Sequence, residues 1–252
     1  MINNNCGSEV SWFSISFDRV ADVYDRTRSL PAKVMRRLIE VLTIELDGCK
    51  KILDLGIGTG RFADPLQRVG FDVFGIDISK KMISNAKGKG VKHLLLGDAR
   101  SLPFKDKAFD ATICIHLLHL ISEWNKALRE VCRVSQYALF SLYYAHRDPV
   151  REAYDQLLRK YGYVRRRPGK SEQELKDLLN PTKFLFVSSY DTHADDRLIN
   201  LEQRTSSSQW EMPESVNLKI VDELKTEFAG KTFEQELYLL MWAIDSLKIL
   251  CC

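Results

Sequence analysis

Between residues 51 and 144, short apolar segments alternate with segments that carry a helical repeat. Apolar runs without polar alternation indicate strands that are buried on both faces, and such strands occur in parallel sheets covered by helices. The pattern therefore predicts an α/β fold. The predicted strands are KKILDL, DVFGIDI, KHLLLGD, FDATICIHLL and YALFSLYY.

The pattern changes on both sides of this region. Residues 16–29 and 31–46 show helical periodicity, and helices are also predicted in the segments 148–162, 171–180 and 213–230. TKFLFVSSYDTH is predicted to be a strand, whereas the pattern of TFEQELYLLMWAID allows a strand or a helix. We expect the last strand to run antiparallel, at or near the edge of the sheet.

Bulk composition excludes several classes of protein. A net charge of +3 over 252 residues is too small to indicate nucleic-acid or membrane binding by itself. The six cysteines form no CxxC pair, so no metal site is predicted. The N-terminus lacks a signal-peptide pattern and no run of about 18 apolar residues occurs, so we expect a cytoplasmic protein without a membrane span.

Three glycines, Gly56, Gly58 and Gly60, follow the first apolar strand. Glycines at such a turn let a ligand lie against bare backbone at the start of the next helix. A P-loop is excluded because no lysine and hydroxyl follow Gly60. A dinucleotide fingerprint is disfavoured because Arg61 stands where a third small residue is required. An ordinary tight turn also remains compatible with the spacing.

Asp77 and Asp98 end the next two predicted strands. A carboxylate at this position can accept hydrogen bonds from both ribose hydroxyls of a nucleoside. Either residue alone would equally suit a strand end or a helix cap. Because ligands of open α/β sheets bind at the carboxyl edge, the succession of these strand ends favours a nucleoside-containing ligand.

Four ordered motifs, LDLGIGTGRF, GIDIS, GDARSLPF and FDATICIHLLHLISEWNKALREVCRV, resemble those of class I S-adenosylmethionine-dependent methyltransferases, type 11. The resemblance covers about residues 15–145 and is greatest to the small-molecule group related to ubiquinone and menaquinone biosynthesis enzymes. It implies a Rossmann-like, seven-stranded, mostly parallel mixed sheet with helices on both faces and a helical cover. It also implies S-adenosylmethionine as cofactor and S-adenosylhomocysteine as product.

The resemblance assigns roles at the cofactor to particular residues. The turn of Gly56, Gly58 and Gly60 would lie beneath the methionine and ribose parts. Asp54 would lie near the amino group of the cofactor, and Arg28 would pair with its carboxylate.

The nucleoside end is assigned in the same way. Asp77 would hold the ribose diol and Ile78 would lie against the adenine. Asp98 would bind the adenine amine, and the backbone of Ala99 would meet the ring. Tyr24 belongs to the YDRTR segment, which matches a helix that closes over the cofactor in this group.

One departure concerns the segment before the fifth predicted strand. The family has LKPGG after RV, whereas this chain reads RVSQYALF, without proline or glycine. The connection is therefore expected to be shorter or built differently.

The resemblance divides the chain into four parts. Residues 1–46 would form an N-terminal helical cover, and residues 47–145 would form the cofactor-binding core. Residues 146–217 would contribute a helical and loop cover with the sixth strand, on the acceptor side. Residues 218–252 would complete the core with the last helix and strand.

Fewer residues are candidates for catalysis and acceptor binding than for cofactor binding. Ile115 and His116 would border the reactive end of the cofactor, and His116 is the candidate general base. His119, Arg204 and Trp210 are candidates for contacts with the acceptor. Each histidine would equally suit a packing role, and no carboxylate stands at an obvious spacing to orient either ring. The basic run at 165–167 reads as a solvated loop or as a dock for an anionic substrate or an RNA backbone.

We therefore predict a methyltransferase that acts on a small-molecule acceptor, as a monomer or homodimer. The alternatives are an RNA methyltransferase acting on tRNA or rRNA, and a non-catalytic protein that binds S-adenosylmethionine. A nicotinamide oxidoreductase is a distant further alternative because of Arg61.

Overall fold

The computed structural model describes residues 15–145, 148–165 and 167–251. Within this part, seven strands form one sheet in the order β3-β2-β1-β4-β5-β7-β6. The early part of the predicted N-terminal cover, residues 1–14, lies outside the described residues, as does Arg166 of the basic run. The strands are β1 (Lys51–Leu55), β2 (Asp72–Asp77), β3 (His93–Leu96), β4 (Phe109–Ile113), β5 (Ser135–Tyr144), β6 (Lys183–His193) and β7 (Thr232–Ala243).

The first five strands pair in parallel, and β7 runs antiparallel to both β5 and β6. This arrangement confirms the predicted Rossmann-like, seven-stranded mixed sheet, with the last strand antiparallel and next to the edge. The sequence pattern of β7 allowed either a strand or a helix. The reason is that β7 is paired on both sides and buries residues at consecutive positions, which removes the alternation typical of a strand. The helices are α1 (Tyr24–Arg28), α2 (Ala32–Glu45), α3 (Ala63–Arg68), α4 (Lys80–Gly88), α5 (Trp124–Val134), α6 (Pro149–Lys160), α7 (Glu172–Leu179), α8 (Ala194–Glu202), α9 (Glu214–Phe228) and α10 (Ile244–Cys251).

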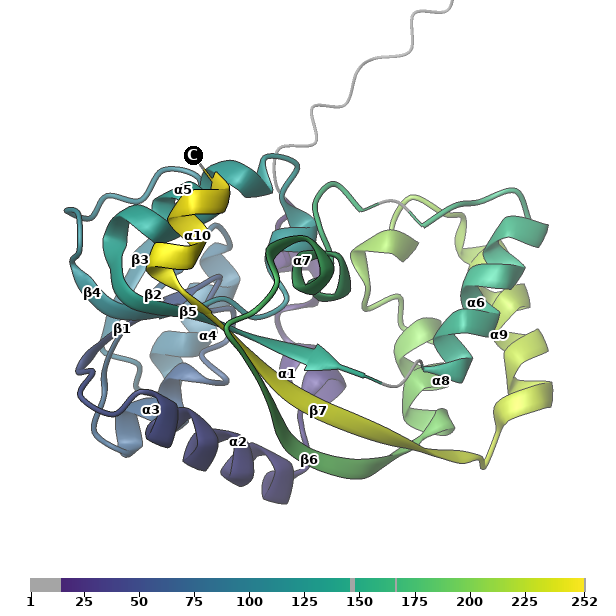
Figure 1. The fold of residues 1–252 in the computed structure, drawn as a ribbon. Coiled ribbons are helices and arrows are strands. Elements are labelled where there is room, and N and C mark those ends of the chain that lie inside the picture. The colour runs from purple at the N-terminus through teal and green to yellow at the C-terminus, as the bar shows by residue number, and fades with distance from the viewer. Residues whose placement is uncertain (1–14, 146–147, 166, 252) are drawn as a thin grey trace, which may run out of the picture.

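Helices cover both faces of the sheet (Figure 1). On one face, Leu38 and Leu42 of α2 pack with Ile52 and Ile113 of the central strands. On the other face, α5 and α10 pack against the sheet, with Trp242 of β7 in the same cluster. Each face thus has its own apolar core, as a parallel sheet requires.

The placement of α2 differs from the expected division, in which all of residues 1–46 covered the cofactor edge. Its apolar side packs on the face of the sheet and against β6. The segment before it is a short 3-10 turn, Asp18–Val20, followed by α1, instead of the single helix expected over 16–29. Among the described residues of the expected N-terminal cover, this short segment is the part left to cover the edge.

Helices α6, α8 and α9 form a third apolar cluster of their own at one end of the molecule (Figure 1). Tyr154, Leu198 and Ile220 lie at its centre. The expected boundary at residue 217 therefore falls inside α9, which packs in the cover and not on the core. Among the described helices, none combines the length and apolar character needed to cross a membrane.

The connection before β5 is as short as the missing LKPGG motif suggested. Helix α5 ends at Val134 and β5 begins at Ser135, without an intervening residue. The side-chain hydroxyls of Ser135 and Thr112 hydrogen-bond at 2.6 Å within the sheet. A buried hydroxyl pair thus fixes the start of β5 beside β4.

Substitution in α2 tests its place in the core. Leu42→Ala should lower the free energy of unfolding by about 2–5 kcal/mol, because a fully buried side chain leaves a cavity. Ile44→Ala on the same helix is the control: Ile44 is 67% exposed, so the change should stay within about 0.5 kcal/mol. Urea unfolding of both variants measures the difference, and equal losses would contradict the packing of α2.

Candidate active site

A cavity of about 750 Å³ opens along the carboxyl edge of the strands. Its walls come from the strand ends, from α1 and from the segments around α6, α7 and α8. The volume lies in the range typical of small-molecule sites. The predicted site residues that line it are Tyr24, Arg28, Gly56, Gly58, Asp77, Ile78, Asp98, Ala99, Ile115, His116 and His119.

The glycine turn is bonded to the end of β2. The N–H groups of Gly56 and Ile57 donate to the carbonyl of Ile76 at 2.9 and 3.1 Å, and Gly58 N–H donates to the Asp77 carboxylate at 2.9 Å. Gly58 has φ +55°, and a Cβ there would face open space with only the Tyr24 ring at 4.0 Å. The bare backbone at Gly58 therefore lies against the cavity, as predicted.

Gly60 has a different reason to be glycine. It does not line the cavity, and a Cβ would lie 2.9 Å from the Val91 side chain and 3.2 Å from Ala86. Its small size permits close packing of the turn against α4 and the segment after it. The third glycine supports the turn from behind and has no surface on the cavity.

The Asp77 carboxylate lines the cavity and accepts hydrogen bonds from the backbone N–H groups of Gly58 and Ser79, both at 2.9 Å. Burial raises the pKa of Asp77, while these hydrogen bonds act in the opposite direction. A carboxylate has about four lone-pair sites, so two further acceptor positions remain for a diol.

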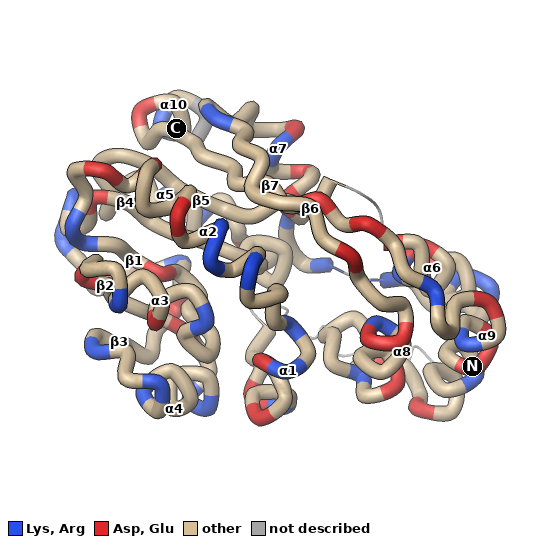
Figure 2. Tube along the Cα trace, turned by 90° about the horizontal axis from the view of Figure 1, so that it is seen from below, with Lys and Arg blue, Asp and Glu red and all other residues tan. Residues whose placement is uncertain are grey.

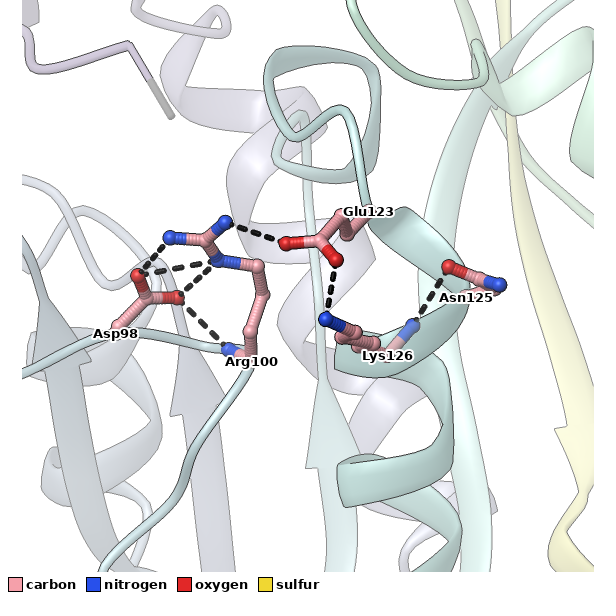
Figure 3. A network of polar contacts seen from close by, with 5 residues as sticks. All are labelled: Asp98, Arg100, Glu123, Asn125 and Lys126. Carbon is pink, nitrogen blue, oxygen red and sulfur yellow. Dashed lines mark hydrogen bonds and ion pairs between the residues drawn. The ribbon is translucent and has the colours of Figure 1, made fainter. Parts of the chain in front are cut away.

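Asp98 lines the cavity but is already engaged by a neighbour (Figure 3). Arg100 binds both of its oxygens, at 3.0 Å through Nε and 2.6 Å through a terminal nitrogen, and also contacts Glu123 at 2.9 Å. Hydrogen bonds from Arg100 hold the pKa of Asp98 below its usual range. From the sequence, Asp98 was expected to bind the adenine amine, and Arg100 was not identified as a partner of Asp98.

Asp54 is buried beneath the turn and does not reach the cavity wall. Its Oδ2 has no hydrogen-bond partner among the described residues. Burial, with the charge of Asp77, raises the pKa of Asp54 to about 7. An unpartnered buried acceptor of this kind is costly, and a donor or cation placed above it would relieve the cost.

Arg28 lies on the opposite wall. Its guanidinium donates to Ser206 Oγ at 2.9 Å and to the Thr205 carbonyl at 3.5 Å, and makes no ion pair with a carboxylate among the described residues. Burial lowers the pKa of Arg28. The planar guanidinium fits a carboxylate with two parallel hydrogen bonds, so its remaining donors suit an anionic ligand group.

His116 has a carboxylate partner that no obvious sequence spacing indicated. Its Nδ1 lies 3.1 Å from Oε1 of Glu172, at the start of α7. His119 Nδ1 lies 3.8 Å from the same oxygen, which is an ion-pair distance and too long for a hydrogen bond. Because 56 residues separate His116 from Glu172, no spacing rule in the sequence could reveal the pair.

The charge state of this pair follows from its surroundings. Burial lowers the pKa of His116, against the opposing effect of Glu172. Burial also acts to raise the pKa of Glu172, but His116 and His119 outweigh it and hold that pKa well below the usual range. Burial and the Glu172 carboxylate thus act on the charge of His116 in opposite directions. The His116 ring stacks on Tyr144 at 5.6 Å between centroids, which fixes its plane.

Arg204 and Trp210, the other candidates for acceptor contacts, do not line the cavity. The Arg204 guanidinium donates to three backbone carbonyls, those of Gln209, Trp210 and Met212. The Trp210 indole donates to the Arg204 carbonyl at 2.9 Å. The structure thus gives both residues a role in shaping this segment, and the neighbouring serines 206–208 line the cavity instead.

The fold and the site together define a Rossmann-like α/β protein with a nucleoside-sized cavity at the carboxyl edge of its sheet. Residues 53–137 match the family model described as a methyltransferase domain. The predicted resemblance to class I S-adenosylmethionine-dependent methyltransferases is confirmed over this part of the chain.

Curated relatives cover the same region. Demethylmenaquinone methyltransferase of Renibacterium salmoninarum is 33% identical over 124 residues, which are 48% of this chain and 52% of that protein. The uncharacterised methyltransferase YcgJ of Bacillus subtilis is 37% identical over 119 residues, which are 44% of this chain and 47% of that protein. The chain thus matches about half the length of these relatives.

Solved structures extend the likeness in fold. YcgJ of Bacillus subtilis superposes with a TM-score of 0.54 at 24% identity, over 81% of this chain and 97% of that chain. The 4+2 cyclase SpnF superposes with a TM-score of 0.54 at 20% identity, over 90% of this chain and 93% of that chain. Because one of these proteins is a cyclase, the fold alone does not define the reaction.

Asp54 makes the unliganded protein sensitive to pH. Asp54 keeps its proton in the folded state up to about pH 7, whereas in the unfolded state it loses the proton above about pH 3.8. The free energy of unfolding should therefore fall as the pH rises from about 3.8 to about 7. Asp54→Asn should remove this loss, whereas Asp47→Asn, at an exposed position, should keep it. Urea unfolding at about pH 5 and about pH 8 measures both slopes. Equal slopes for wild type and Asp54→Asn would contradict a protonated Asp54.

Proposed function

We propose that this protein transfers a methyl group from S-adenosylmethionine to a small-molecule acceptor. One observation carries the proposal. The Gly58 backbone and the Asp77 carboxylate are bonded together at the wall of a cavity large enough for the cofactor. The methyltransferase domain spans this junction.

The charged groups of the cavity match those of the cofactor. Asp77 would accept from the ribose hydroxyls, with Ile78 and Ala99 beside the adenine. Arg28 would bind the carboxylate, and Asp54, which lies behind the cavity wall, would meet the cationic amino group through water. These residues therefore fit the nucleoside part and the charged methionine part of S-adenosylmethionine.

S-adenosylmethionine supplies a methyl group on a cationic sulfur, which is already activated for an in-line displacement. The protein then has to hold the acceptor in line and to remove its proton. If Nδ1–H of His116 donates to Glu172, the lone pair of Nε2 is free to accept that proton. Glu172 would stabilise the resulting imidazolium and is a positioning residue.

A small acceptor is favoured over RNA by the shape and charge of the site. The candidate base lies on the wall of a cavity and not on an open face. Figure 2 shows positions of Lys and Arg interspersed with positions of Asp and Glu along the Cα trace. A polynucleotide would be expected to need cations that follow its backbone. A cytoplasmic location is part of the proposal, since the buried Cys114 forms no disulfide.

The ribose contact can be tested with the reaction product alone. Asp77→Ala should weaken binding of S-adenosylhomocysteine by about 1–3 kcal/mol, because the hydroxyls lose their acceptor. Asp72→Ala is the matched control, at the opposite end of the same strand and away from the cavity, and should leave affinity unchanged. Calorimetry gives both values. Full affinity in a folded Asp77→Ala protein would refute the assignment.

The His116–Glu172 pair can be tested before an acceptor is known. Glu172→Gln should lower the pKa of His116 further, since it removes the charge that favours the imidazolium. The His116 resonance followed by NMR against pH measures this shift. Asp177→Asn, an exposed change on the same helix, should leave it in place.

With an acceptor in hand, His116→Ala should slow turnover far more than it weakens binding of S-adenosylhomocysteine. General-base catalysis contributes about 10²–10⁴-fold in rate. A rate equal to that of wild type would reduce His116 to a packing residue.

A further inference from the structure

Three arginines converge on the acceptor side of the cavity. Arg151 lies in the first turn of α6, and Arg165 and Arg167 lie between α6 and α7; all three line the cavity. Arg165 is anchored by Asp155 at 2.8 Å and its side chain is only 14% exposed. With the other described residues, the side chains of Arg151 and Arg167 form neither a hydrogen bond nor an ion pair.

The charge of this cluster is compensated only in part: Asp155 pairs with Arg165, whereas Arg151 and Arg167 are exposed residues without a paired carboxylate among the described residues. The surrounding protein and the charges of Arg165 and Arg167 lower the pKa of Arg151, against a smaller opposing effect of Asp155 and Asp148. A guanidinium nevertheless stays protonated in a protein. Asp148 is also engaged elsewhere, because it pairs with Arg197 at 2.9 Å. Like charges held together in this way attract an anion, which would relieve their repulsion.

The segment that carries Arg167 packs against the segment that follows the candidate base. The Gly169 N–H donates to the His119 carbonyl at 3.2 Å. The contact is so close that a Cβ on Gly169 would lie 1.9 Å from the Leu118 carbonyl oxygen. The chain therefore passes tightly from Arg167 to Glu172, and the charge of Glu172 is felt at Arg167. A molecule that reached His116 from the acceptor side would meet these cations.

We propose that Arg151 and Arg167 bind an anionic group of the methyl acceptor, a carboxylate or a phosphate. The inference rests on the proposed function and names its substrate class: a small acid that also carries a nucleophile with a removable proton. In the reaction, the new bond joins the methyl carbon to the nucleophile while the carbon–sulfur bond breaks. The electron pair of that bond stays on sulfur, and the proton of the nucleophile passes to His116.

A small acid fits these observations better than an RNA phosphate. Arg151 and Arg167 reach the lining of the same cavity as His116 from two separate segments. Two guanidinium groups can together bind one carboxylate or phosphate through several charge-assisted hydrogen bonds. A polynucleotide would require cations that follow its backbone outside the cavity.

The test uses two probe anions, inorganic phosphate and benzoate. Each is titrated by calorimetry into the full chain, with and without S-adenosylhomocysteine, at constant ionic strength set with chloride. The double variant Arg151→Gln with Arg167→Gln is compared with wild type. Arg159→Gln, an exposed arginine on the same helix α6, is the matched control.

Wild type should bind at least one anion saturably. The double variant should bind that anion about tenfold more weakly, or not at all. The control variant should match wild type, and S-adenosylhomocysteine should bind all three proteins equally. A preference for phosphate or for benzoate identifies the acidic group. Equal anion affinity in wild type and double variant, or no saturable binding to wild type, would overturn the inference.

Failure of the inference and failure of the proposed function give different results. Normal binding of S-adenosylhomocysteine without anion binding overturns only the acidic acceptor. Anion binding without binding of S-adenosylhomocysteine overturns the methyltransferase proposal. A single-stranded RNA that displaces phosphate from wild type, and that the double variant no longer binds, would replace the small acid by RNA.

Discussion

The hydrogen bonds between the glycine turn and the end of β2 are the constraint on which the site depends. Two successive N–H groups of the turn donate to the Ile76 carbonyl, and the next donates to the Asp77 carboxylate. Backbone and carboxylate are thereby fixed together at the tips of two adjacent parallel strands. Because parallel strands end at one edge, β4 brings Ile115 and His116 to the same cavity.

Several ionisable groups in or behind the cavity lack a compensating partner within the described protein. Asp54 has an orphaned oxygen, Arg28 has hydroxyl and carbonyl partners only, and the exposed Arg151 and Arg167 face like charges. For the buried Asp54 this costs stability unless a ligand or a water molecule supplies a partner. Together they describe ligands with an amino group and a carboxylate on the cofactor side, and an anion on the acceptor side. The His116–Glu172 pair, by contrast, is internally satisfied and ready to take a proton.

The parts of this account that follow from the sequence are the local ones. Strands β1 to β5 and the turn at Gly58 carry apolar runs and glycines that are read within a few residues. The partner of His116 and the position of Arg151 arise from the packing of α6 and α7 at the cavity, and no local pattern encodes that packing. Arg204 illustrates the reverse. Its polar segment suggested a binding role, but the Arg204 guanidinium donates its hydrogen bonds to backbone carbonyls. Likewise, the apolar face of α2 marked a buried helix without indicating which surface it covers.

The most direct test is a crystal structure of the protein with S-adenosylhomocysteine. The account predicts the ribose hydroxyls on Asp77, the adenine beside Ile78 and Ala99, and the carboxylate on Arg28. The sulfur should then face the part of the cavity that holds His116. A nucleoside bound elsewhere, or a ligand lying in this cavity with its sulfur directed away from His116, would contradict it.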